Sequence, residues 1–150
     1  MEIIKVENVF KIYQDNAVAV NALNGINLTI NQGDYMVIAG QSGSGKTTLL
    51  NIIGTLDIPT SGKIYLEGND LSKKSKNMLA EIRLQKIGFI FQAYNLLPVL
   101  TALENIEFTM MLRKIPEKER QERALAVMND LGIGELANKI PNQMSGGQQQ

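Results

Sequence analysis

A glycine-rich stretch, residues 40–48, lies between two apolar segments of this chain. It consists of Gly40, Gln41, Ser42, Gly43, Ser44, Gly45, Lys46, Thr47 and Thr48. The apolar run 35–39 before it is predicted to be a buried strand, and the run 49–53 after it a helix. Glycines reach backbone angles that are closed to other residues, so successive N–H groups can close around an anion. The spacing therefore predicts a phosphate-binding loop between a strand and a helix.

The polar side chains of this loop suit a nucleoside triphosphate. Lys46 supplies a positive charge for the β- and γ-phosphates, and the hydroxyl of Thr47 can bind Mg²⁺. The helix that begins here presents unpaired N–H groups and the positive end of its dipole to the same anion. We therefore expect ATP and Mg²⁺ as cofactors.

Composition restricts the other possibilities. The 15 basic and 15 acidic residues cancel, which disfavours a nucleic-acid partner. The chain has no cysteine, so it has no disulfide or thiolate metal site and fits a reducing cytosol, and it has no histidine. No apolar run approaches the ~20 residues that span a bilayer, so a membrane role is expected to need a partner.

The periodicity divides the chain into two predicted domains, residues 1–92 and 93–150. In the first domain, a turn at Asp15 and Asn16 separates two strands of an antiparallel edge, 3–13 and 17–30. Further along we expect a strand at 63–67, a helix at 77–83, and a strand of the central sheet at 87–91. The helix after Lys46 is expected to end near Gly54.

The second predicted domain is mostly helical. Thr101 and Glu104 form a capping box for a helix that runs to about Arg113. Another helix is predicted to start at Pro116 and to stop at Gly132. Its expected apolar face consists of Leu125, Met128 and Leu131. The apolar segment 96–100 is either an internally packed loop or a docking surface for a partner.

The end of the chain carries a resemblance to a known family. Met144, Ser145, Gly146, Gly147 and Gln148 resemble the L-S-G-G-Q signature of ATP-binding-cassette (ABC) ATPases, and they follow a phosphate loop and a strand ending in Gln92. The resemblance covers residues 1–150. It implies an α/β fold: a P-loop NTPase core with an antiparallel β edge and a helical subdomain, incomplete at the C-terminus.

The same resemblance implies roles for individual residues. Tyr13 falls where the family places an aromatic that stacks on adenine, although a strand-end aromatic is equally often a core residue. Gln92 would complete the Mg²⁺ shell or orient water. In a head-to-tail dimer, Ser145, Gly146, Gly147 and Gln148 of one copy would contact the ATP held by the phosphate loop of the other.

Four short segments of the sequence resemble, within the family, the macrolide-export and lipoprotein-release type of ATPase subunit most closely. They are residues 50–54, 59–62, 91–98 and 103–105. Such subunits work with an integral-membrane permease subunit and a second ATPase copy. The implied location is cytoplasmic and peripheral, at the inner face of the cell membrane through that partner.

The chain also departs from the family pattern, because it ends at Gln150 soon after the signature. The acidic strand end that holds Mg²⁺, the catalytic glutamate and the switch histidine are missing from it, as is the helix after the signature. We therefore expect the N-terminal portion of an ATPase, marginally stable, which binds ATP weakly and does not hydrolyse it alone. We also expect the strand before the phosphate loop to be left unpaired.

Two alternatives to a transporter subunit stay open. One is a soluble ABC ATPase of repair or translation, and the other is a non-catalytic nucleotide-binding fragment. A GTPase is disfavoured, because the guanine-reading N-K-x-D pattern has Pro141 where the aspartate is needed.

Overall fold

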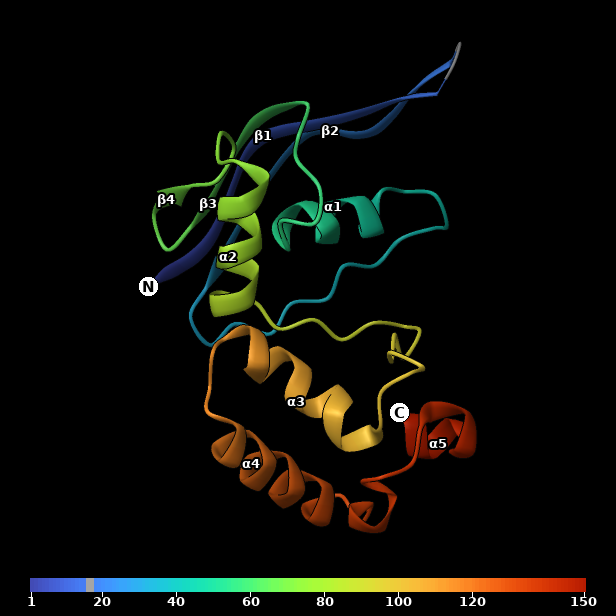
Figure 1. Cartoon of the computed structure of the whole chain (residues 1–150). Helices are drawn as coiled ribbons and strands as arrows, with labels where there is room; N and C mark the ends of the chain where they lie inside the picture. Colours follow the sequence, from blue (N-terminus) through green and yellow to red (C-terminus); the bar gives the residue numbers. More distant parts are fainter. Residues whose placement is uncertain (16–17) are drawn as a thin grey trace. The chain divides into compact units, whose positions relative to one another are not determined.

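The computed structural model describes residues 1–15 and 18–150, which form two compact units, Met1–Ile87 and Gly88–Gln150 (Figure 1). Asn16, part of the predicted turn, and Ala17 lie outside the described residues. The domain boundary predicted after Gln92 stays a prediction.

The first unit is built on one antiparallel sheet. Its strands are β1 (Glu2–Asp15), β2 (Val18–Asn31), β3 (Ser61–Leu66) and β4 (Asn69–Asp70), in the spatial order β2-β1-β3-β4. Each neighbouring pair is antiparallel. The predicted strand pair at the N-terminus and the strand at 63–67 are therefore confirmed, whereas β4 is an addition.

A bulge in β1 sets which of its side chains enter the core. Ile4 and Val6 are buried in alternation, and the next buried residue is Val9, three positions on. Asn8 between them has φ 47°, and the register with β2 shifts here. Gly62 lies opposite, where a Cβ would come within 2.3 Å of the Asn8 carbonyl oxygen. The bulge is thus accommodated by a residue without a side chain.

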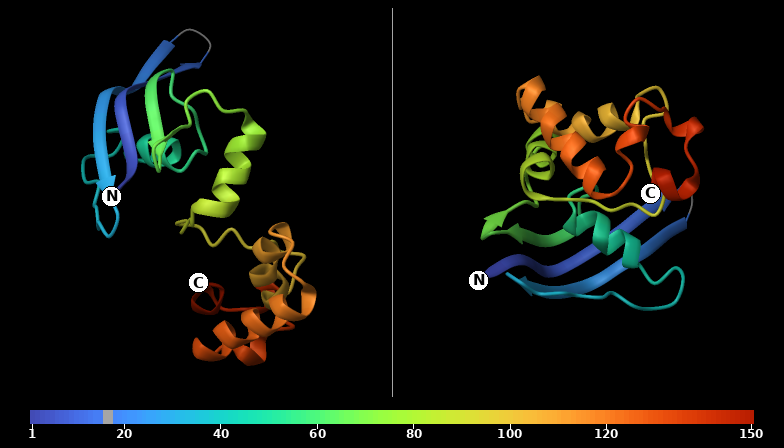
Figure 2. Two further views of the ribbon diagram at one scale, coloured as in Figure 1. Left: turned by 90° about the vertical axis from the view of Figure 1, so that its left-hand side faces the viewer. Right: turned by 90° about the horizontal axis from the view of Figure 1, so that it is seen from below.

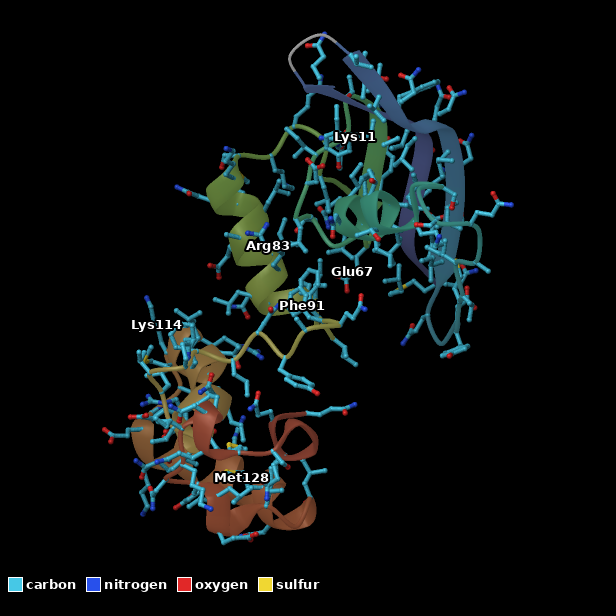
Figure 3. The ribbon with its side chains drawn as sticks, turned by 90° about the vertical axis from the view of Figure 1, so that its right-hand side faces the viewer. Lys11, Glu67, Arg83, Phe91, Lys114 and Met128 are labelled. Carbon is cyan, nitrogen blue, oxygen red and sulfur yellow. The ribbon has the colours of Figure 1, made fainter. Side chains whose placement is uncertain are left out.

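Two helices complete this unit, α1 (Lys46–Ile53) and α2 (Lys76–Lys86). Figure 2 shows α1 against one face of the sheet. As predicted, α1 ends at Gly54. Arg83 Nη1 of α2 donates a 2.6 Å hydrogen bond to the carbonyl of Thr55, in the loop after α1 (Figure 3). The core between sheet and helices contains Ile4, Val6, Val9, Leu23, Leu49, Ile52, Ile64, Leu66, Leu71 and Leu79.

The second unit is helical. It contains α3 (Ala102–Leu112), α4 (Glu117–Asp130), two short 3₁₀ turns, η1 (Gly134–Leu136) and η2 (Pro141–Gln143), and α5 (Gly146–Gln149). In Figures 1 and 2, α3 and α4 lie side by side. The predicted capping box is confirmed, since Thr101 and Glu104 exchange hydrogen bonds at the start of α3. Gly132 follows α4 with φ 70°, as expected of a helix stop.

The predicted apolar face of α4 was only partly right. Met128 is fully buried, together with Ala124 one turn earlier (Figure 3). Leu125 is 38% exposed and Leu131 is 68% exposed. The buried stripe therefore follows the i, i+4 pair of Ala124 and Met128, and the two leucines flank it.

The strands predicted at 35–39 and 87–91 are not formed. Within the described residues, neither segment is hydrogen-bonded to another strand, and each runs as irregular backbone. Tyr35 is 94% exposed, Val37 is 71% exposed, and the side chain of Ile90 is completely exposed. An apolar run becomes a strand only when a neighbour pairs with its backbone groups, and the sheet of the described chain provides none here. The unpaired backbone expected before the phosphate loop is thus observed.

None of the helices in the described part of the chain is both long and apolar enough to cross a membrane.

Candidate functional site

The phosphate loop forms a cavity with one strand of the sheet. The cavity measures about 530 Å³ and is open to solvent. The strand β2 contributes Val20, Asn21 and Ala22, and the loop with the start of α1 contributes Ser42, Gly43, Ser44, Gly45, Lys46, Thr47 and Thr48. The cavity is within the size range of small-molecule sites. Its lining combines backbone donors, hydroxyl groups and one cation.

The ammonium group of Lys46 lies over the loop that precedes its own helix. Its Nζ is 2.9 Å from the carbonyl oxygen of Gly40 and 2.6 Å from that of Gln41. It is also 3.4 Å from Ser44 Oγ. These contacts hold a positive charge at the cavity, where it can meet an anionic oxygen.

Gly45 joins the loop to the helix in a place where no other residue fits well. Its φ of 88° lies in the left-handed region, and a Cβ would come within 2.3 Å of the Ala22 carbonyl oxygen. Among the described residues, no side chain accepts a hydrogen bond at the start of α1. The first-turn N–H groups of α1 therefore remain as donors for a ligand.

This donor set fits the triphosphate of a nucleotide and its Mg²⁺. The lining offers N–H, hydroxyl and ammonium groups, and none of the cavity residues is acidic. Thr47, at the second position of α1, is exposed and offers a hydroxyl oxygen. In the described part of the chain, no group of three or more acidic residues could hold a metal by itself. Thr47 is the residue of this lining that could hold Mg²⁺, together with the phosphates of its nucleotide.

Tyr13 lies on the same face of the sheet as the cavity but outside its lining. In the antiparallel register Tyr13 is directly opposite Val20, so both side chains point to one face. Tyr13 as a whole residue is 40% exposed. The hydroxyl donates to Asp57 Oδ2 at 2.8 Å, and Lys11 Nζ is 4.8 Å from the ring centroid.

Gln92 belongs to the second unit, where it is exposed at a bend. The apolar loop after it is held by one side chain that the sequence analysis did not single out, Asn105 of α3. Asn105 accepts a hydrogen bond from Leu97 N–H and donates to the carbonyls of Leu97, Leu100 and Thr101. Val99 at the tip is 83% exposed. The position of Asn105 four residues after the capping threonine was the available signal, because that spacing places it on the same helix face.

The signature residues start a helical turn in the second unit. Ser145 is the N-cap of α5 and forms a capping box with Gln148. This turn, Gly146–Gln149, lies almost entirely within the signature, so the expected absence of a helix after the signature stays a prediction. A Cβ at Gly146 would lie 3.5 Å from the hydroxyl of Tyr94, which places the loop after Gln92 beside the signature. The signature lies in the second unit and the phosphate loop in the first.

Comparison with known proteins identifies relatives of the whole chain. An ABC transporter ATP-binding protein of Thermotoga maritima is 48% identical over 149 residues, covering 99% of this chain and 64% of that protein. The macrolide export ATP-binding/permease protein MacB of Brucella abortus is 44% identical over 148 residues, 99% of this chain and 23% of that protein. The chain thus spans less than two thirds of the length of either relative.

A solved structure shares the fold. The dimeric post-hydrolysis state of the ATP-binding cassette MJ0796, bound to ADP and phosphate, superposes with a TM-score of 0.89 at 42% identity. The match covers 98% of this chain and 65% of that one. The fold is therefore that of an ABC ATPase cassette, a mixed α/β structure with an antiparallel sheet, present here in part. The sequence profile of the family described as "ABC transporter" matches residues 23–150 of this chain. The chain therefore belongs to the ABC transporter family, and its 150 residues correspond to an ATP-binding domain like that of MacB-type proteins.

Proposed function

We propose that this chain binds Mg-ATP at the phosphate loop and serves as the ATP-binding part of a transporter. One observation carries the proposal: the cavity in which Lys46 Nζ, the hydroxyls and the first-turn N–H groups of α1 converge. In this proposal Lys46 contacts the β- and γ-phosphates, and the loop 40–48 surrounds them. Thr47 holds Mg²⁺, Gln92 completes its shell or orients water, and Tyr13 stacks on adenine.

The partners in this proposal are a second copy of the ATPase and an integral-membrane permease. The dimeric state of the MJ0796 cassette supports the first, and the fused ATP-binding and permease parts of MacB support the second. In the dimer, Ser145, Gly146, Gly147 and Gln148 of one copy would contact the nucleotide of the other. The exposed tip of the loop held by Asn105 is the proposed contact with the permease, which would place the protein at the inner face of the cell membrane.

We propose further that these 150 residues alone bind ATP without turning it over. Gln92 could orient the attacking water, but hydrolysis also needs a carboxylate that activates it, and the residues that line the phosphate cavity include none. Binding needs only the donors that the loop and α1 supply.

The test is a calorimetric titration of Mg-ATP into the wild-type chain and into Lys46→Ala. The substitution removes a charge-assisted contact, so we expect the affinity to fall about 10- to 100-fold, the equivalent of roughly 1.5–3 kcal/mol. Lys63→Ala is the matched control, because Lys63 is an exposed cation on β3 of the same unit and does not line the cavity.

Equal affinity of the wild type and Lys46→Ala would show that ATP does not bind at the loop. If Lys63→Ala lowers the affinity for Mg-ATP by the same factor, the loss in Lys46→Ala would reflect net charge alone and not a contact of Lys46 with the phosphates. Phosphate release over many turnovers by the wild-type chain, abolished by Lys46→Ala, would contradict the proposal of binding without hydrolysis.

A further inference from the structure

Lys11, Tyr13 and Asp57 of the first unit form a cluster of three interacting side chains. Asp57, in the loop between α1 and β3, accepts a hydrogen bond from Tyr13 Oη at 2.8 Å on one carboxylate oxygen. Its other oxygen lies 2.7 Å from Lys11 Nζ and 2.8 Å from the N–H of Ile58. Lys11 in turn donates to the Ile58 carbonyl at 2.9 Å. The cluster ties β1 to a loop more than 40 residues further along the chain.

The carboxylate of Asp57 is held firmly in its ionised form. Its side chain is only 25% exposed and that of Lys11 only 11% exposed. Partial burial by itself would raise the pKa of Asp57, but the hydrogen bonds from Lys11, Tyr13 and the Ile58 N–H outweigh it and lower the pKa below its ordinary value. Asp57 therefore stays an acceptor for the Tyr13 hydroxyl throughout the physiological pH range.

The cluster also fixes the orientation of the Tyr13 ring. The ammonium of Lys11 lies 4.8 Å from the ring centroid, over one face of the ring, while the residue Tyr13 stays 40% exposed. Because Tyr13 is opposite Val20, a cavity residue, the ring lies on the side of the sheet where the nucleotide is proposed to bind. A flat base would stack on the face that Lys11 leaves open.

We propose that Asp57 is a positioning residue for adenine: it holds the Tyr13 ring, through the hydroxyl, in the orientation that stacks on the base. The inference rests on the proposed function, since it concerns how the same site takes its nucleotide. A ring that is already held binds a base without the cost of ordering a side chain. Asp57 thus acts on the adenosine part of the ligand and leaves the phosphate contacts unchanged.

The experiment compares two ligands that share the phosphates and differ in the base. The dissociation constants of Mg-ATP and of Mg-tripolyphosphate are measured by calorimetry, and the dissociation constant of tripolyphosphate divided by that of ATP is the ratio that reports the contribution of adenosine. The variants are Asp57→Ala, which removes the acceptor, Tyr13→Phe, which keeps the ring and removes the hydroxyl, and the double variant. Asp70→Ala is the control, because Asp70 of β4 is likewise a hydrogen-bonded carboxylate, which accepts from Ser72 N–H.

We expect Asp57→Ala and Tyr13→Phe each to lower the ratio roughly 2- to 10-fold, the effect of ordering one side chain (about 0.5–1.5 kcal/mol). The double variant should fall no further than either single one, because both break the same hydrogen bond. Tripolyphosphate affinity should be unchanged in every variant, and Asp70→Ala should leave the ratio at the wild-type value.

Other outcomes separate this inference from the proposed function. An unchanged ratio in both single variants, with ATP still bound, would overturn the role of Asp57 and leave ATP binding at the loop intact. Equal losses for ATP and tripolyphosphate would mean that Asp57 supports the loop structurally, which also contradicts the inference. A wild-type ratio of one would show that adenosine contributes nothing, and with it both the stacking on Tyr13 and the role of Asp57 would fall.

Discussion

At the scale of the residue, Gly45 shows why the phosphate loop needs glycine for two separate reasons. Its φ of 88° is unfavourable for any residue with a Cβ. In addition, β2 passes so close that a Cβ would meet the Ala22 carbonyl at 2.3 Å. The first reason is local and is carried by the motif. The second depends on packing against a strand that lies more than 20 residues earlier in the chain.

The two reasons can be separated with Gly45→Ala and Gly33→Ala. Gly33 has nearly the same φ, 85°, but a Cβ there would have open space around it. We expect Gly33→Ala to lower the free energy of unfolding by about 1–2 kcal/mol through the backbone alone. Gly45→Ala should cost about 1–3 kcal/mol more, because β2 or the loop has to move. Urea denaturation of both variants measures the difference, and equal losses would show that the contact with Ala22 is unimportant.

At the scale of the element, a prediction from the sequence was right when the residues that determine the structure lie within a few positions of it in the chain. The cap of α3, the stop after α4 and the glycines of the loop all lie within a few residues of the structure that they determine, and each was predicted from the sequence. The strands expected at 35–39 and 87–91 were not formed, because a strand is completed by a neighbour that a single apolar run does not specify. The bulge at Asn8 and the short strand β4 were missed for the same reason.

The candidate site divides in the same way. The loop residues follow from their spacing, whereas the partner of Tyr13 does not, because Asp57 is 44 residues away and meets it only through the packing of a loop. Nothing near Asp57 in the sequence marks it. Asn105 lies between these cases, since its spacing from Thr101 was visible but its bonds to the loop 97–101 were not.

The capping box of α3 gives a prediction at this scale. Thr101→Ala removes the side chain that accepts from the Glu104 N–H, and we expect it to lower the free energy of unfolding of the second unit by about 1 kcal/mol. Thr109→Ala, at an exposed position within the same helix, should cost nothing. Chemical denaturation followed by circular dichroism at neutral pH distinguishes the two, and equal stability of both variants would contradict the role of the cap.

The same box predicts a dependence on pH. Hydrogen bonds from the backbone and then the hydroxyl of Thr101 lower the pKa of Glu104 below the ordinary 4.5. Because the pKa of Glu104 is lower in the folded chain than in the unfolded chain, the ionised carboxylate gives its full stabilising contribution above about pH 4.5. That contribution is lost as the pH falls through the lowered pKa. Glu104→Gln should therefore weaken the decline of stability between neutral pH and pH values well below 4.5. An identical decline in the wild type and the variant would contradict this.

At the scale of the whole molecule, the parts of the proposed site are divided between the two units. The phosphate loop, Tyr13 and Asp57 lie in residues 1–87, whereas Gln92 and the signature lie in residues 88–150. Binding of the triphosphate needs only the first set. The second set would act on a bound nucleotide in the assembled dimer. The residues that line the phosphate cavity therefore all belong to the first unit.

The most direct measurement of ATP binding at the loop is a titration of the ¹⁵N-labelled chain with Mg-ATP, followed through the backbone amide resonances. We predict that the largest and saturable shifts belong to the amides of residues 42–48, because these N–H groups surround the phosphates. Tripolyphosphate should move the same amides and leave the surroundings of Tyr13 unchanged. If the amides of 42–48 keep their positions at saturating Mg-ATP, or if the shifts cluster elsewhere in the chain, the loop is not the nucleotide site and the account is wrong.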